Sequence, residues 1–444
     1  MAGEWRAVPL DSLIESGRGI SYGIVQPGAP VDEGVPIVRV SDVRDGRVAV
    51  STPLRVAPAI EAAYARTRLK GGELLLTLVG TVGEAAIAPE SLAGWNVARA
   101  VAVIPVRKEI GAYWVKLALQ APGVREIIDS RLNTTVQATL NLGDVAKLPI
   151  VMPPSRERRA IAHILGTLDD KIELNRRTSE TLEAMARALF KSWFVDFDPV
   201  RAKMEGRDPG LPQALADLFP ARLVDSELGQ IPEGWEVGIL ADLAVLNSEV
   251  WTKQTRPPEI NYVDLSNTKW GRIEAVTVHA AVDAPSRAQR VLRPGDTIVG
   301  TVRPGNGSYA LISEDGLTGS SGFAVLRPSK LQYAQFVYLA ATAAENIDAL
   351  SHLADGGAYP AVRPDVVAAT PAVLPNQQVL GRFSLVVEPL LAKMAYNERE
   401  SRTLATLRDA LLPKLISGEL RITDAEKAMK RAESCAEGYV RSVS

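Results

Sequence analysis

The chain has 444 residues, 46% of them hydrophobic and 23% charged, which is typical of a soluble globular protein of about two to four domains. Its formal net charge of −2 argues against a protein that holds DNA by itself through bulk phosphate neutralisation, because such proteins are more basic. The single cysteine, Cys435, excludes an internal disulfide and a cysteine-rich zinc site, and it fits a reducing cytoplasm.

The first segment, up to about residue 150, mixes short β-type runs with turns. Its opening "MAGEWRAVPLDSL" has no basic and apolar leader, and its most apolar stretch, "LLLTLVGTVGEAAIA", carries Gly and Glu. We therefore expect a cytoplasmic protein without a signal peptide or membrane span. The run "VPIVRVSDVRDGRVAV" alternates and turns at Asp45-Gly46, which predicts a hairpin, and a helix is predicted at about 112–130. Residues 1–150 hold 16 basic and 15 acidic residues, so this segment has almost no basic excess.

A long helix follows the first segment. Residues 168–190 contain no Gly or Pro, and their apolar positions extend in both directions with alternating steps of four and three. This spacing is typical of the heptad seam of a coiled coil. From Ile161 to Asp196 such a helix would be roughly 52 Å long at the usual rise per residue. The two middle positions of the seam, Asn175 and Ser179, are polar.

A connector at 201–233, rich in Pro, Gly and Asp, leads to a second globular segment. There "NYVDLSNTKWGRIEAV" (261–276) predicts another hairpin, and a helix is predicted at about 332–350. The loop "RPGNGSYA" (303–310) is interpreted as a strand-to-strand turn, because a lone pair of glycines is a weak cofactor signal. Residues 235–375 hold 11 basic and 14 acidic residues, so this segment is not basic either.

The second half of the chain repeats the first. "LPIVMPPSRERRAIAHIL" (148–165) matches "TPAVLPNQQVLGRFSLVV" (370–387) without a gap, at an offset of 222 residues. "YWVKLAL" (113–119) falls on "QFVYLAA" (335–341) at the same offset. The predicted order is a first globular domain (1–150), a helical region (151–200), the connector (201–233), a second globular domain (234–375), a second helical region (376–423) and a mobile tail (424–444).

The same offset gives the second helix the same polar break, because Asn397 and Ser401 take the positions of Asn175 and Ser179. We predict that the helices pair antiparallel, with Asn175 facing Ser401 and Ser179 facing Asn397, since a buried polar layer penalises shifted registers. In the alternative, each helix packs on its own globular domain and the Asn is exposed. Pro389, which has no counterpart in the first helix, is a candidate to delay or kink the second. The predicted seam consists of Leu168, Ile172, Asn175, Ser179, Leu182 and Leu189 in the first helix and Leu390, Met394, Asn397, Ser401, Leu404 and Leu411 in the second.

No catalytic signature appears along the chain. There is no Gly-Lys dipeptide and hence no P-loop, no His-Glu-x-x-His, and no Asn/Asp-Pro-Pro-Tyr/Phe motif of the kind that amino-methyltransferases use. The three histidines, at 163, 279 and 352, are scattered. We therefore expect a non-catalytic protein with no metal site and no cofactor of its own.

The stretch "PPSRERRAIAHILGTLDDKIELNRRTSETLEAMARALFKSWFVDFDPVRAKMEG" (153–206) closely resembles the first conserved region of the specificity (S) subunits of type I restriction–modification systems. "LVDSELGQIPEGWEV", "GGAYPAVRPDVV" and "LRDALLPKLISGELRI" resemble the connector, second-domain end and C-terminal region of that family. The likeness covers nearly the whole chain in the right order. It departs from the family where a glutamate-rich stretch usually follows the two prolines, because "SRERR" and "NQQVL" stand there.

The resemblance implies an α+β fold in which two similar target-recognition domains are separated by two long helices that form an antiparallel coiled coil, with an internal pseudo-twofold repeat. Each domain would read one half of a bipartite DNA site, and the helices would set the spacer and dock partner subunits. The implied partners are double-stranded DNA, two adenine-N6 methyltransferase subunits that carry S-adenosylmethionine, and motor-nuclease restriction subunits that use ATP and Mg²⁺. The chain would supply sequence specificity to DNA methylation and phage defence.

The candidate DNA-binding residues come from two loops and two hairpins, by analogy between the domains. The loop 130–141 and its counterpart 351–363 carry donors and acceptors that can reach base edges or phosphates. The alternative for each arginine is an ordinary solvated surface group. The candidates are Arg131, Thr134, Thr135 and Gln137 in the first loop, His352, Tyr359 and Arg363 in the second, Arg39, Ser41, Arg44 and Arg47 in the first hairpin, and Asn267, Lys269 and Arg272 in the second.

Two functions of different classes fit these observations. The first is a DNA-reading subunit of a methyltransferase/restriction complex, and the alternative is a coiled-coil protein adaptor without nucleic-acid binding. The near-neutral charge favours the adaptor, whereas the doubled domain and the family motifs favour the DNA-reading subunit more strongly. Salt-dependent, sequence-selective binding of DNA by the assembled complex would discriminate between them.

Overall fold

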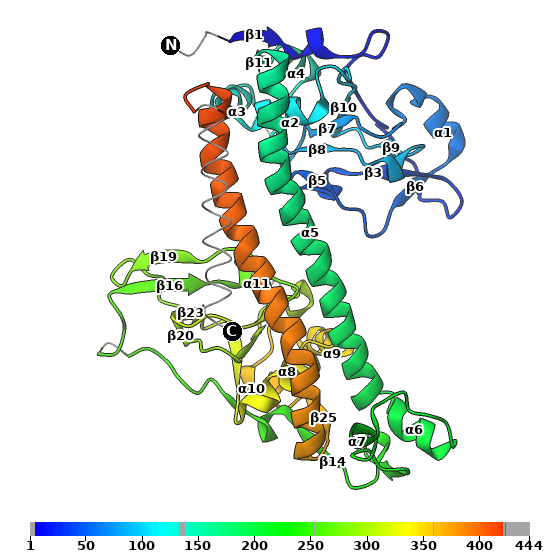
Figure 1. The fold of residues 1–444 in the computed structure, drawn as a ribbon, viewed down its shortest axis with the longest axis vertical. Coiled ribbons are helices and arrows are strands. Elements are labelled where there is room, and N and C mark those ends of the chain that lie inside the picture. Colours follow the sequence, from blue (N-terminus) through cyan, green and yellow to red (C-terminus); the bar gives the residue numbers. More distant parts are fainter. Residues whose placement is uncertain (1–4, 133–137, 253, 358, 421, 423–444) are drawn as a thin grey trace. The chain divides into compact units, whose positions relative to one another are not determined.

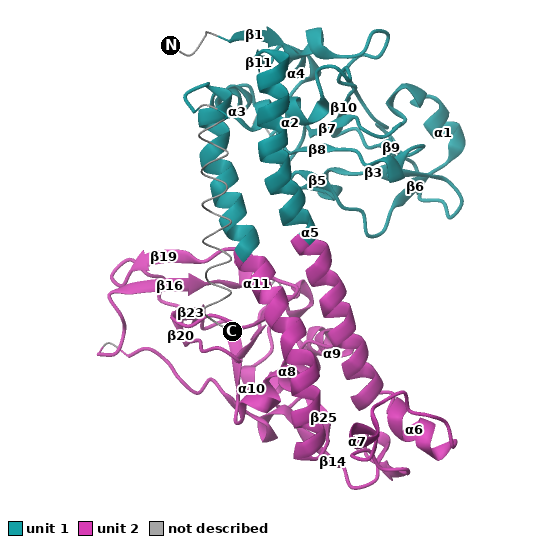
Figure 2. Ribbon diagram, viewed as in Figure 1, with its two compact units in different colours: residues 1–174, 400–444 teal, residues 175–399 magenta. Residues whose placement is uncertain are grey.

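The two long helices predicted from the sequence are α5 (Ser155–Phe194) and α11 (Gln377–Ile416) of a computed structural model, and Figure 1 shows both. The structure describes residues 5–132, 138–252, 254–357, 359–420 and 422. It divides into two units (Figure 2): unit 1 is 1–174 with 400–444, and unit 2 is 175–399. Each unit holds a mixed helix-and-sheet globular part and one half of each long helix, so the predicted α+β class is confirmed.

The start and the end of each globular part pair with each other. In unit 1, β1 (Arg6–Pro9) and β11 (Pro149–Met152) form an antiparallel ribbon. In unit 2, β14 (Glu236–Ile239) and β25 (Pro371–Leu374) do the same. After each ribbon only two residues intervene before the long helix begins, so the ribbon determines where the chain enters the helix.

The larger sheets of the two units have the same strand order, and the smaller sheets share the order of three strands, to which unit 2 adds a fourth. The larger sheet is β2 (Ser21–Tyr22), β10 (Val101–Ile104), β7 (Leu74–Thr77) and β8 (Ala85–Ile87) in unit 1, and β15 (Ala244–Leu246), β24 (Phe323–Pro328), β21 (Thr297–Gly300) and β22 (Tyr309–Leu311) in unit 2. The smaller sheet is β6 (Leu54–Val56), β3 (Val35–Val38) and β9 (Asn96–Val97) in unit 1, and β19 (Thr277–Ala280), β16 (Glu259–Val263), β23 (Leu317–Ser320) and β20 (Ala288–Val291) in unit 2. The repeat seen in the sequence is therefore a repeat of topology.

Both predicted hairpins form, and their turns have the same geometry. Asp45 and Gly46 join β4 (Val43–Arg44) to β5 (Arg47–Val48), and Trp270 and Gly271 join β17 (Thr268–Lys269) to β18 (Arg272–Ile273). All four turn residues have positive φ, from 46° to 85°, as two-residue hairpin loops of type I′ require. The loop after β21 is the predicted strand-to-strand turn, and it contains the short 3₁₀ helix η7 (Pro304–Asn306).

Each single helix predicted within the globular parts is in fact two helices. Residues 112–130 form α2 (Ala112–Gln120) and α3 (Pro122–Ser130), because a residue before proline is driven out of the helical region; Ala121 has a ψ of 138°. The counterpart in unit 2 is α8 (Ala334–Ala341) followed by α9 (Ala344–Leu353). There no proline intervenes, and the break is at Ala343, whose ψ is 142°.

Each unit has its own apolar core, built from the globular part and the adjoining halves of the long helices. In unit 1, Trp114 and Ile150 lie in one buried cluster with Leu165 of α5 and Leu415 of α11. The core of unit 2 is richer in aromatic residues. The Phe194 ring centroid lies 4.8 Å from Phe383 and 5.0 Å from Phe336, both nearly perpendicular, which is a favourable geometry for aromatic pairs.

The predicted connector has structure of its own and belongs to unit 2. Its Phe219 and Ile231 are buried in the core of unit 2, and the Phe219 ring centroid lies 5.3 Å from Trp193 of α5. The connector is therefore packed against the end of α5. Its elements are α6 (Asp198–Met204), α7 (Gln213–Ala216) and the ribbon of β12 (Leu223–Ser226) and β13 (Gly229–Pro232). The globular parts also contain the short α-helices α1 (Pro58–Ala62), α4 (Leu142–Ala146) and α10 (Pro364–Ala368).

The long helices run antiparallel in unit 2. Asn397 Nδ2 donates to Ser179 Oγ at 3.2 Å and to the Asn175 carbonyl at 3.4 Å, while Phe383, nearer the start of α11, contacts Phe194 at the end of α5. Asn175 and Asn397 are only 3% and 2% exposed. The predicted contact between Ser179 and Asn397 is confirmed, and the alternative with exposed asparagines is wrong.

The long helices also run antiparallel in unit 1, where an ion pair of 2.9 Å joins Asp169 to Arg408 and one of 3.2 Å joins Lys171 to Glu400. Pro389 does not delay α11, which begins at Gln377. Pro389 and Leu385, whose carbonyl loses its usual helical donor, are both exposed, so water can bond this carbonyl.

Candidate nucleic-acid interface

The first hairpin carries two arginines with different surroundings: Arg47 contacts α5, and Arg44 is exposed. Arg47 pairs with Glu173 of α5 at 3.6 Å and with Asp45 at 3.8 Å, so this candidate contacts the helix within unit 1. Gly46 has a φ of 73°, and a Cβ there would lie 2.9 Å from the Lys116 ammonium, so a larger residue would be strained and would displace this side chain. Arg44 is exposed, and no hydrogen bond or ion pair of its side chain is found in the described part of the chain.

The other two candidates of this segment lie just before the hairpin. Arg39 pairs with Asp42 at 3.3 Å and donates to the Thr52 carbonyl at 3.4 Å, and Ser41 is exposed, with its hydroxyl 3.4 Å from the Asp42 carboxylate. Arg39 and Ser41 are therefore exposed but bonded to Asp42, whereas the exposed Arg44 has no side-chain partner in the described part of the chain.

The first candidate loop packs on the turn between β7 and β8. The Gly80 amide donates to the Ala138 carbonyl at 3.0 Å, which fixes the end of the loop. Arg131 donates to the Asp144 carbonyl at 3.1 Å and lies 4.0 Å from the Asp144 carboxylate, so its guanidinium is tied to α4 within the domain. The loop candidates Thr134, Thr135 and Gln137 lie outside the described residues.

The second hairpin carries an exposed aromatic residue at its turn. Trp270 is 56% exposed and stands on Gly307 of the turn after β21, where a Cβ would lie only 2.5 Å from the indole ring. The Trp270 centroid lies 6.0 Å from that of buried Tyr309, at an interplanar angle of 88°. Trp270 therefore packs against Gly307 and Tyr309 on one side, while more than half of its surface remains exposed to solvent.

The predicted candidates of this hairpin are less accessible than its tryptophan. Arg272 lies 3.8 Å from Glu180 of α5, which repeats the contact of Arg47 with the same helix one heptad earlier. Lys269 and Asn267 are half-buried, and Asn267 ends a short 3₁₀ turn. Sequence reasoning missed Trp270, although a large aromatic residue at a predicted hairpin turn is a signal that could have been used.

The second candidate loop contributes a tyrosine that pairs with an arginine of the turn after β21. Tyr359 is 73% exposed, and the Arg303 guanidinium carbon lies 5.0 Å from its ring centroid, a cation–π contact. The Arg303 amide donates to the Pro360 carbonyl at 2.8 Å, so loop and turn are bonded together. His352 is exposed on α9, and Arg363 forms an exposed ion pair of 3.1 Å with Asp365.

Trp270, Arg303 and Tyr359 form what we call the aromatic–arginine cluster. Its members come from three segments, and the turn 303–307 links them because it supports the indole at one end and the tyrosine at the other. Aromatic and arginine side chains are the residues most often responsible for binding energy at interfaces. The cluster is the most distinctive surface feature of unit 2, and Arg303 lay in a loop that the sequence identified only as a turn.

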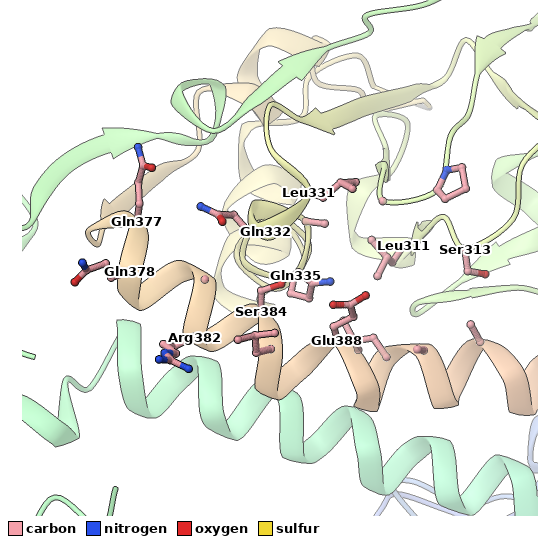
Figure 3. Close-up of a pocket in the computed structure, with 18 of the residues that line it drawn as sticks. Leu311, Ser313, Leu331, Gln332, Gln335, Gln377, Gln378, Arg382, Ser384 and Glu388 are labelled. Atoms are coloured by element: carbon pink, nitrogen blue, oxygen red, sulfur yellow. Dashed lines mark hydrogen bonds between the residues drawn. The ribbon is translucent and has the colours of Figure 1, made fainter. Parts of the chain in front are cut away.

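A pocket of about 920 Å³ lies elsewhere in unit 2, between α8, the first half of α11 and the β21–β22 sheet (Figure 3). Gln335 and Ser384 lie side by side in it, and the Ser384 hydroxyl donates to the Gln335 side-chain carbonyl at 2.9 Å. The only ionisable side chains of its lining are Arg382 and Glu388, so the pocket offers amide, hydroxyl and apolar contacts and no paired carboxylates.

Among the residues that the structure describes, no three His, Cys, Asp or Glu side chains are grouped so that they could hold a metal ion. None of the described helices is long and apolar enough to span a membrane.

The features of the first globular part lie in a segment that matches a known protein family. Residues 23–184, which include the first hairpin, the first candidate loop and most of α5, match the family model of the type I restriction modification DNA specificity domain. The HindI specificity subunit of Haemophilus influenzae is 27% identical over 341 residues, which are 66% of this chain and 73% of that protein. The chain therefore carries a type I restriction modification DNA specificity domain at residues 23–184, and it is similar to a type I specificity subunit over about two thirds of its length.

Two further specificity subunits and one solved structure are also similar to this chain. The EcoBI specificity subunit of Escherichia coli is 30% identical over 159 residues, 36% of this chain and 33% of that protein. The MjaIX specificity subunit of Methanocaldococcus jannaschii is 22% identical over 373 residues, 80% of this chain and 78% of that protein. The crystal structure of a type I S subunit from M. genitalium has the same fold, with a TM-score of 0.55 at 16% identity over 93% of this chain and 96% of that one.

Proposed function

We propose that this specificity subunit directs a type I restriction–modification complex to DNA, and that each globular part reads one half of a bipartite site. The observation that carries the proposal is the doubled arrangement of a type I′ hairpin and a loop packed on a strand turn, present once in each unit. A 40-residue helix is roughly 60 Å long, and one turn of DNA is about 34 Å, so such helices have the length to separate two half-sites.

The charge of the chain favours partners that supply part of the phosphate contacts. Neither globular part has a marked basic excess, and the arginines Arg47, Arg131 and Arg272 already have acidic neighbours. We therefore expect affinity for the DNA backbone to come largely from two adenine-N6 methyltransferase subunits that carry S-adenosylmethionine, and from motor-nuclease subunits that use ATP and Mg²⁺. In this assembly the chain acts in the cytoplasm as the non-catalytic subunit that chooses the sequence.

The deciding experiment maps methylated adenines in the host genome by single-molecule sequencing, with and without this chain. We expect N6-methyladenine in one bipartite, asymmetric motif to disappear when the chain is removed and to return when it is supplied again. A methylation pattern that does not depend on the chain would favour the alternative, a coiled-coil adaptor that binds proteins only.

The aromatic–arginine cluster leads to a prediction on the second half-site. Trp270→Ala is expected to weaken binding of the assembled complex to its target about tenfold or more, because truncating an aromatic anchor at an interface can cost about 2 kcal/mol or more. Fluorescence anisotropy with target DNA at fixed salt measures the effect. Val282→Ala, at a highly exposed apolar residue of the same unit, is the control. Equal affinities of the two variants would remove Trp270 from the interface.

A further inference from the structure

Asp169 of α5 joins three elements of unit 1 through one carboxylate. Its Oδ1 accepts from Arg408 of α11 at 2.9 Å. Its Oδ2 accepts from the Tyr113 hydroxyl at 2.9 Å and from the Lys116 ammonium at 3.4 Å, both on α2. The carboxylate therefore connects the two long helices to each other and to the globular part.

This carboxylate is largely withdrawn from water and stays charged. The side chains of Lys116, Asp169 and Arg408 are 9%, 19% and 28% exposed. Burial by itself raises the pKa of Asp169, but Lys116 and Arg408 outweigh this effect, so its pKa lies below the usual value. Removing one partner of such a group leaves a poorly solvated charge without compensation, which is more destabilising than losing an exposed pair.

Tyr113 and Lys116 lie close to two glycines. A Cβ on Gly166, one helical turn before Asp169, would lie at an ordinary contact distance of 3.5 Å from the Tyr113 ring, and a Cβ on Gly46 would lie 2.9 Å from the Lys116 ammonium. Both side chains therefore pack against neighbouring backbone while they contact Asp169.

The positions related by the 222-residue offset are apolar or neutral. Asp169 corresponds to Leu391, Arg408 to Ala186, Lys116 to Tyr338 and Tyr113 to Gln335. Ala186, Leu391 and Tyr338 lie in one buried apolar cluster of unit 2, and Gln335 bonds to Ser384 instead. The helix pair is therefore charged in unit 1 and apolar at the equivalent position in unit 2.

This difference matters because the polar central layer cannot tell the helices apart. Both carry Asn and Ser at equivalent positions, so a pair of two first helices or of two second helices would keep that layer. In a pair of two second helices, however, Arg408 would meet Leu391 of the other copy and would lose Asp169. In a pair of two first helices, Asp169 would meet Ala186 but would keep Lys116 and Tyr113.

We propose that the Asp169–Arg408 pair makes this coiled coil heterotypic: it selects the first helix as the partner of the second and rejects a second copy of α11. The apolar counterpart in unit 2 provides stability but no such choice. This assignment does not depend on DNA recognition, since it concerns which helix faces which.

The test uses two differently tagged full-length chains expressed together. Asp169→Leu with Arg408→Ala copies the residues of unit 2 into unit 1, so both ends of the coil become alike. We expect this double variant to increase the amount of one tagged chain that is captured with the other by about tenfold, equivalent to about 1.4 kcal/mol. Light scattering of the captured protein should give the mass of a dimer. Arg408→Lys keeps the charge and should behave like the unchanged chain.

Lys171→Ala with Glu400→Ala is the matched control, because this pair also crosses between the helices. In the second helix, Lys393 takes the position of Lys171. In a pair of two second helices, Glu400 would therefore still face a lysine. The Lys171–Glu400 ion pair consequently does not favour a first helix over a second helix as the partner. We expect the control to lower the thermal midpoint without raising the dimer fraction.

Three outcomes decide the proposal. A double variant that stays monomeric while its midpoint falls as in the control would overturn it, because the pair would then only stabilise. Equal dimer fractions in the double variant and the control would also overturn it. If the double variant does not fold, Arg408→Ala alone replaces it. The proposal then requires a rise in the dimer fraction, smaller than the tenfold rise expected of the double variant. No rise would overturn the proposal.

Discussion

Replacing residues 1–152, up to the end of β11, with the corresponding domain of a type I specificity subunit will change one half of the methylated sequence and leave the other half unchanged. The physical reason is that the first domain is closed by its own β1–β11 ribbon, and its hairpin and loop contact only elements of unit 1 in the described contacts. The donor domain should carry Tyr and Lys at the positions of Tyr113 and Lys116, so that Asp169 keeps its partners. Methylation of the original motif should be lost completely.

Single-molecule sequencing of the host genome measures this result, and the reciprocal replacement of residues 234–375 is its control. The reciprocal chain should change the other half of the motif. If either replacement altered both halves together while the protein remained folded, reading by independent domains would be wrong.

Asn175→Leu with Asn397→Leu is expected to make the coiled coil more stable and the spacer between half-sites less strictly defined. Both asparagines are buried, and the Asn397 side-chain carbonyl oxygen has no hydrogen-bond partner among the described residues, so its burial is unfavourable. Removing it should raise the free energy of unfolding by about 1–3 kcal/mol. Without the polar layer, a shift by one heptad, roughly 10 Å of helix or about three base pairs, is penalised less, because only the ion pairs between the helices and the apolar contacts then oppose it.

Thermal unfolding and mapping of methylated adenines measure the two effects. We expect a higher midpoint together with methylation at sites whose spacer differs by about three base pairs. Thr181→Leu adds the same side chain at an exposed position of α5, and it should alter neither quantity. A double variant that methylates only the original spacing would show that the register is set elsewhere.

The repeat, the two hairpins, the strand turn at 303–310 and the buried Asn–Ser layer were all predictable from the sequence. Each depends on residues close together along the chain or at a regular spacing. Turn residues with positive φ make a hairpin, and steps of four and three make a seam, because local geometry dictates both. The helix predicted at 112–130 is helical over that range but is broken at Ala121, for the equally local reason that Pro122 follows.

The sequence by itself therefore determined the internal repeat, the two hairpins and the polar contact between the long helices. Only the tertiary structure decided which candidate side chains are accessible. Arg47 and Arg272 contact Glu173 and Glu180 of α5, far away in the sequence, and an arginine's partner cannot be read from its neighbours along the chain. The aromatic–arginine cluster and the Asp169 contacts exist for the same reason: they join segments that only the fold brings together, where burial raises the cost of an unpaired charge.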